Sequence, residues 1–160
     1  MITIGTDIHC YCEYKNKETD KWVLANPVFP NYQYSEEGWL QKDGCFTNCN
    51  YNLFSYLAGV RGMHDAIKDP CGVPSDMSDA LQEVWDEEKE WSHTPTWYTM
   101  KELRDAVDEA EKEYDAEDYD DYYFSPECLW RFYTLMDYIF DMNGIYYNGD
   151  DCRVVMWFDS

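Results

Sequence analysis

The chain has 160 residues, of which 45% are hydrophobic and 18% are aromatic. This is the length of one ordinary domain with enough apolar side chain for a packed core, so we expect a single domain over residues 1–160 and exclude an intrinsically disordered chain. Thirty-three Asp and Glu against twelve Lys and Arg give a formal net charge of −21, which repels phosphate and disfavours direct binding of nucleic acid.

The N-terminal part of the chain predicts a β-hairpin followed by a loop. Apolar and polar side chains alternate over residues 2–14, a pattern typical of a half-buried strand. A polar turn at residues 15–20 leads to a returning strand over residues 22–25, which ends before a proline because proline cannot donate to the ladder. The aromatic segment 27–48 has no periodicity, and we predict an ordered loop there.

The middle of the chain predicts two helices and a second loop. A short helix is expected over residues 50–62, with Asn50 as its N-cap. A second helix begins after either Ser75 or Ser78 and carries an apolar stripe along one side. Residues 92–97 contain a proline between two threonines and predict a loop.

The C-terminal part predicts two longer helices and a strand. A capping box at residues 99–102 opens the first helix, and residues 125–142 form the second, which is strongly apolar. Residues 153–158 are β-branched and aromatic, and we expect this strand to pair with the first one in the middle of the sheet. These elements define an α+β fold: a small, mostly antiparallel sheet of about three strands, the hairpin plus the C-terminal strand, with about four helices over one face.

Seven cysteines, an odd number, and the absence of a secretion signal indicate reduced thiols. No run of 18 apolar residues occurs, so we expect a cytoplasmic protein with no membrane association. Cys10 with Cys12 and Cys45 with Cys49 are the thiols that a metal ion would use, but neither pair has the two-residue spacing usual for structural zinc. Buried free cysteine is the commoner role for such residues, so we expect no cofactor and keep a metal ion as the alternative.

Three segments contain residues suited to a binding or catalytic site. Asp7 and His9 point to the same side of a strand, where a carboxylate can orient an imidazole; the simpler alternative is a polar pair facing solvent. His93 and Trp97 flank a helix start, where they would either meet a ligand or form a capping loop. Arg61 closes an apolar helix and would either bind an acidic ligand group or interact with the helix C-terminus.

Four motifs occur in one order along the chain: Gly5-Thr6-Asp7-Ile8-His9, Asn50-Tyr51-Asn52-Leu53-Phe54 continuing to Leu57-Ala58-Gly59-Val60-Arg61, Gly72-Val73-Pro74 followed by Asp76, and Ser92-His93 followed by Trp97, Thr99, Glu102 and Leu103. Together they resemble a family of uncharacterised bacteriophage and prophage proteins. The chain departs from the family pattern where Ser55 replaces an alanine and Thr94-Pro95-Thr96 replaces Ser-x-Ser, so no role of those serines is carried over.

The resemblance implies a phage origin, and therefore a location in the host cytoplasm, but it implies no activity. It also implies that five side chains converge in one candidate pocket. These are Asp7, His9, Arg61, His93 and Trp97.

A run of acidic residues gives the leading functional hypothesis. Residues 102–121 carry eleven carboxylates against two basic residues, and a helix face of this kind can imitate the spaced phosphates of a duplex. We therefore expect a non-enzymatic accessory protein that binds and modulates a host protein. The expected partner is a nucleic-acid-handling or defence protein, which would contact the acidic face through a basic groove. The candidate interaction face consists of Asp108, Glu111, Asp115 and Asp118.

Two other interpretations of the same residues stay open. The acidic run is also explained by a solvated face that keeps the protein soluble. The alternative function is a small ligand-binding or metal-binding pocket, or a small hydrolase, that uses Asp7, His9 and His93. No nucleophile elbow, phosphate-binding glycine loop or metalloprotease helix supports an enzyme.

Overall fold

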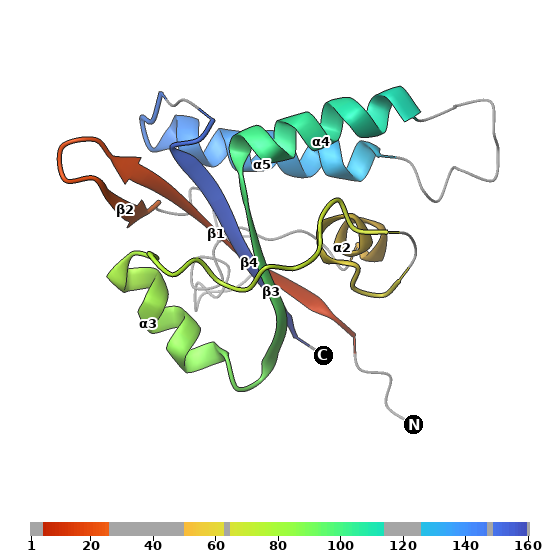
Figure 1. The fold of residues 1–160 in the computed structure, drawn as a ribbon, viewed down its shortest axis with the longest axis horizontal. Coiled ribbons are helices and arrows are strands. Elements are labelled where there is room, and N and C mark those ends of the chain that lie inside the picture. Colours follow the sequence, from red (N-terminus) through yellow and green to blue (C-terminus); the bar gives the residue numbers. More distant parts are fainter. Residues whose placement is uncertain (1–4, 26–49, 63–64, 114–125, 147–148, 160) are drawn as a thin grey trace, which may run out of the picture.

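The computed structural model describes residues 5–25, 50–62, 65–113, 126–146 and 149–159. Within these ranges four strands form one antiparallel sheet in the order β2-β1-β4-β3, with four helices around it (Figure 1). The strands are β1 (Asp7–Asn16), β2 (Lys21–Leu24), β3 (Ser92–Thr99) and β4 (Cys152–Asp159). The α+β class is confirmed, and the sheet has four strands where three were predicted.

The N-terminal and C-terminal strands lie side by side at the centre of the sheet. β1 pairs with β4 in an antiparallel register that places Ile8 opposite Phe158 and Tyr11 opposite Val155. Seven of the eight β4 residues are buried, because this strand is hydrogen-bonded on both sides and covered on both faces. The predicted pairing of the two terminal strands is confirmed.

The fourth strand is the segment that the sequence predicted as a loop. Residues Ser92–Thr99 pair with β4, and the register slips between His93 and Thr96. The slip accommodates Pro95, which is tolerated because β3 is an edge strand and the proline lies at an irregularity in the ladder. The loop prediction is therefore wrong: the proline obscured an alternating pattern that continues on both sides of it.

Two shorter helices start at side-chain caps. α2 (Tyr51–Ala58) begins where the Asn50 side chain accepts a hydrogen bond from the backbone N–H of Leu53, as predicted, and it ends at Gly59, three residues before the expected stop. Gly59 has φ of 69°, a left-handed conformation that glycine adopts without a steric penalty. α3 (Asp79–Glu88) is capped by Ser78, which settles the choice between the two serines.

Two longer helices follow β3. α4 (Met100–Glu113) opens with the predicted capping box, in which Thr99 and Glu102 bind each other's backbone N–H groups. α5 (Glu127–Met142) buries the predicted apolar side of the helix. No helix in the described ranges is long and apolar enough to cross a membrane.

The helices cover both faces of the sheet, whereas the sequence predicted one covered face. α2, α4 and α5 pack on the face that carries Ile8 and Phe158, and α4 and α5 lie side by side (Figure 1). α3 packs on the opposite face through Leu81 against Tyr11 and Trp157. Because adjacent residues of a strand point to opposite faces, this second layer buries the alternate positions of β1 that were expected to face solvent.

Several predictions fall outside the described residues. These are the loop over residues 27–48, the start of the first strand at residues 2–4, and the side chains of Cys45, Cys49, Asp115 and Asp118.

Candidate functional site

The face of the sheet under α3 contains a buried ionic cluster. The Nε and Nη2 groups of Arg153 lie 2.9 and 2.8 Å from Oε1 of Glu13, and these two side chains are 2% and 0% exposed. Arg153 Nη1 donates to Oδ1 of Asp76 at 2.7 Å, and its guanidinium lies 3.8 Å from the ring centre of Trp22. Oε2 of Glu13 accepts the backbone N–H of Ser78 at 2.8 Å, so the cluster attaches the start of α3 to the sheet.

A second polar group on this face surrounds His9. Its Nε2 lies 2.7 Å from Oδ2 of Asp159, and its Nδ1 lies 3.9 Å from Oε2 of Glu88. The same oxygen of Glu88 accepts a hydrogen bond of 2.8 Å from the indole N–H of Trp157. Asp7 is exposed and contacts Asp159 through its backbone N–H. Asp159 is therefore a carboxylate that orients the imidazole, and the sequence analysis did not identify it.

The structure places the two predicted site histidines on opposite faces of the sheet. His9 is paired with Trp157 and points toward α3, whereas His93 is paired with Phe158 and stacks on that ring at a centroid distance of 6.2 Å. Neighbouring residues of β4 point to opposite faces, so the imidazoles lie on opposite sides. Trp97 packs on the α3 face. The prediction that all five residues converge in one pocket is thus wrong.

Arg61 and His93 are the two predicted site residues that the structure brings together. They line a hollow of about 420 Å³ at the end of α2, together with Thr6, Thr94 and residues 58–60. Arg61 Nε donates to Oγ1 of Thr6 at 2.9 Å, and the ring of His93 is hydrogen-bonded through Nδ1 to Oγ1 of Thr94 at 2.9 Å. This hollow is the candidate ligand site of the described residues.

The cysteines of the central strands act as apolar core residues. Cys10 and Cys12 point toward α5, where the Cys12 thiol lies 3.6 Å from the sulfur of Met136. Burial raises the pKa of both thiols well above the ordinary range, and it raises that of Cys152 to about 12. Across the part of the chain that the structure describes, no three His, Cys, Asp or Glu residues are grouped as metal ligands.

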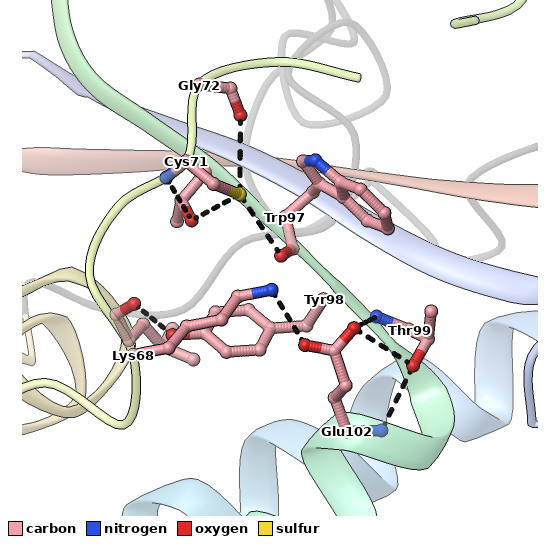
Figure 2. Close-up of polar contacts among 9 residues, drawn as sticks. Lys68, Cys71, Gly72, Trp97, Tyr98, Thr99 and Glu102 are labelled. Atoms are coloured by element: carbon pink, nitrogen blue, oxygen red, sulfur yellow. Dashed lines mark hydrogen bonds and ion pairs between the residues drawn. The ribbon is translucent and has the colours of Figure 1, made fainter. Parts of the chain in front are cut away.

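A third polar cluster holds the segment after α2 against β3 and α4, as Figure 2 shows. Lys68 Nζ lies 2.7 Å from Oε2 of Glu102 and 4.5 Å from the ring centre of Tyr98. The Tyr98 hydroxyl donates to the backbone carbonyl of Leu57, and burial raises the pKa of this phenol. Nearby, the exposed Cys71 bonds to β3 through its backbone N–H and thiol. These contacts are structural, since each one connects elements that pack together.

The outward surfaces of two helices are acidic. On α4 five exposed carboxylates stand against three exposed basic residues, a net of −2, and they include the predicted Asp108 and Glu111. On residues 79–90, five exposed carboxylates stand against one exposed lysine, a net of −4. Their positions are Asp79, Glu83, Asp86, Glu87 and Glu90.

The sequence analysis missed the acidic surface of α3. Its signal is the spacing of 79, 83, 86, 87 and 90, which follows the helical period and places these carboxylates on one side. Asp86 already has local partners, since Lys89 and Gln82 bind its carboxylate and hold its pKa below the ordinary value. The acidic run at 102–121 is the longer of the two, with eleven carboxylates against six in residues 79–90.

Comparison of the chain with protein-family models, curated proteins and solved structures yields no match. The resemblance to phage proteins therefore rests on the four motifs and stays a prediction.

Proposed function

We propose that the protein is a non-enzymatic, phage-type accessory protein that binds and modulates a host protein through its acidic helical surfaces. The partner presents a basic groove of the kind that binds nucleic acid. The observation that carries this proposal is the outward surface of α3, with its net charge of −4 over residues 79–90. Carboxylates four positions apart on a helix are about 5 to 6 Å apart at Cβ, a spacing that suits a row of Lys and Arg side chains.

The packing of α3 supports a surface role for these carboxylates. The inward side of the helix is occupied by Leu81, which is fully buried, and by Glu88, which binds Trp157. The outward carboxylates lie on the other side of the helix and are exposed. These outward carboxylates therefore do not contribute to packing, and their accumulation on one side of the helix is explained either by solubility or by binding to a partner.

An enzymatic function has less support from the described residues. The imidazoles of His9 and His93 lie on opposite faces of the sheet, so they cannot act on one substrate. The buried thiols of Cys10 and Cys12 have raised pKa values and are poor nucleophiles at neutral pH. A hydrolase that uses Asp7, His9 and His93 together would need a different arrangement.

The test separates the two acidic helices with variants of matched charge. One variant carries Glu83→Lys, Glu87→Lys and Glu90→Lys on the α3 side, and the other carries Asp108→Lys, Glu111→Lys and Glu113→Lys on α4. Both change the net charge by the same six units. Immobilised parent protein captures its partner from host lysate, and we expect the α3 variant to bind that purified partner about a hundredfold more weakly.

Two further measurements distinguish mimicry of nucleic acid from other acidic binding. Added duplex DNA should release the captured partner, and binding should weaken steeply as salt rises from about 50 mM to about 500 mM. A partner that binds both reversed variants as tightly as the parent would overturn the proposal. Capture of no partner by the parent would leave solubility as the role of the surface and would also overturn it.

A further inference from the structure

One hollow of the protein has a character opposite to its overall charge. The groove between α4 and α5 is lined by three aspartates and two basic residues, Lys101 and Arg104. The hollow beside Trp22 is lined by three further aspartates and Lys21. The hollow at the end of α2 differs, because its lining includes Arg61 and His93 and, among the residues that the structure describes, no carboxylate. In a chain with a net charge of −21, this hollow is an exception that solubility does not explain.

The guanidinium in this hollow is held from two directions. Its Nε donates to the hydroxyl of Thr6, which is 2% exposed, and its carbon lies 4.8 Å from the ring centre of Tyr51. The Tyr51 hydroxyl in turn accepts the backbone N–H of Thr6 at 3.3 Å. Because its plane is fixed before any ligand arrives, the guanidinium loses little freedom on binding.

The backbone on both sides of the hollow is strained. Arg61 has φ of 67° and Thr94 has φ of 52°, both in the left-handed region that side-chain-bearing residues rarely adopt. The conformation is especially unfavourable for Thr94, which is β-branched and precedes a proline. Such strain is retained where it places side chains for a purpose, and here it flanks the guanidinium of Arg61 and the imidazole of His93.

We propose that this hollow binds a small oxyanion, a carboxylate or phosphate group, through Arg61, His93 and Thr94. A guanidinium offers paired N–H donors that match the oxygens of such a group. His93 Nδ1 and Thr94 Oγ1 are hydrogen-bonded to each other, so one of these two side chains, depending on the imidazole tautomer, adds a donor from the opposite wall. The volume of about 420 Å³ is within the range of small-molecule sites. The proposal is independent of the acidic surfaces, which lie on α3 and α4.

The proposal is tested by titrating the full chain with inorganic phosphate and, separately, with acetate. Amide chemical shifts are recorded by NMR at each step, with chloride added to keep the ionic strength constant. We expect saturable shifts that are confined to residues 58–61 and 93–94 for at least one of the two anions. Saturation by acetate alone assigns a carboxylate ligand, and saturation by phosphate alone assigns a phosphate group. Shifts that stay linear for both anions, or that spread over the whole surface, would overturn the proposal.

Variants identify the side chain responsible. Arg61→Gln should raise the Kd roughly tenfold, because it removes a charge-assisted contact. The matched control is Arg131→Gln, which removes the same charge from an exposed ion pair with Glu127 on α5 and should leave the Kd unchanged. Equal weakening by both variants would show a general charge effect and refute the site.

If Arg61→Gln unfolds the protein, Arg61→Lys and His93→Gln replace it. Arg61→Lys keeps the charge but not the paired donors, and His93→Gln keeps an amide donor. Each should weaken binding measurably in a protein whose amide spectrum is otherwise unchanged. An unaltered Kd in both would overturn the assignment.

Discussion

The two faces of the sheet are equally buried but are built from different chemistry. On the face under α2, α4 and α5, the central strands contribute only apolar side chains and thiols. These are Ile8, Cys10, Cys12, Val154, Met156 and Phe158. On the face under α3, the same two strands contribute a mixture of apolar and charged side chains. These are His9, Tyr11, Glu13, Arg153, Val155 and Trp157.

The difference shows two ways of attaching a helix to a sheet. An apolar face gains stability in proportion to the area removed from water, and it tolerates many partners of the right size. A face with buried charges adds little net stability, but it accepts only a partner that satisfies every charge. Glu13 and Arg153 therefore determine where α3 starts, because the backbone of Ser78 binds Glu13 and Asp76 binds Arg153.

The largest expected effect comes from removing one member of the buried ion pair. Arg153→Met leaves the carboxylate of Glu13 buried without its cation and should lower the free energy of unfolding by about 3 to 5 kcal/mol, as measured in urea. Adding Glu13→Leu should recover at least half of the loss, because the buried charge is then gone. A single variant that loses less than about 1 kcal/mol would contradict the role of this pair.

A truncation on the apolar face should cost a similar amount but should not be recoverable in this way. Phe132 of α5 is 1% exposed, and Phe132→Ala should lower the free energy of unfolding by about 3 to 5 kcal/mol. Adding Leu103→Ala should increase the loss, since both truncations leave space and neither leaves a charge. A double variant that is more stable than Phe132→Ala alone would contradict the proposed difference between the apolar face and the charged face.

An intermediate effect is expected at the hydrogen bond between Glu88 and Trp157. Glu88→Leu leaves the buried indole N–H without its acceptor and should cost about 1 to 3 kcal/mol. Glu88→Gln retains an oxygen acceptor and should cost less than half as much, as judged by the same urea melts. Equal losses in the two variants would assign the effect to shape or charge instead of the hydrogen bond.

The smallest effect concerns acid stability at Asp76. Burial acts to raise the pKa of this carboxyl, but hydrogen bonds from Arg153 and Trp22, together with the charge of Arg153, outweigh it and lower the pKa. A lowered pKa contributes stability that is present above the ordinary value near 3.8 and is lost as pH falls through the folded-state value.

Asp76→Asn should therefore destabilise the protein slightly at pH 6 and reduce its further loss of stability below about pH 4. The free energy of unfolding, measured across this range, checks the prediction. Glu83→Gln removes the same charge from the exposed side of α3 and serves as the control. If, below about pH 4, the free energy of unfolding of Asp76→Asn falls as steeply as that of the parent, the predicted contribution of Asp76 to acid stability would be contradicted.

Local patterns in the sequence determined most elements of the fold. The helix starts at Asn50 and Thr99 are visible because a cap is a short-range hydrogen bond whose donor and acceptor lie within three residues. For α3 the same rule leaves Ser75 and Ser78 as candidates, and the structure selects Ser78. The hairpin and the terminal strand can be predicted from the sequence because a strand is identified from its own residues, without knowing which strand it pairs with. The apolar side of α5 follows from its helical period for the same reason.

The tertiary structure alone decided which polar residues are buried. Alternation along β1 divides its residues into two faces, but it does not tell whether the polar face meets water or another layer. Glu13 meets Arg153, which is 140 residues away, and His9 meets Asp159, which is 150 residues away. The sheet itself separates His9 from His93, because their partners Trp157 and Phe158 are neighbours on β4. The hollow beside Arg61 is formed by side chains that no local pattern connects.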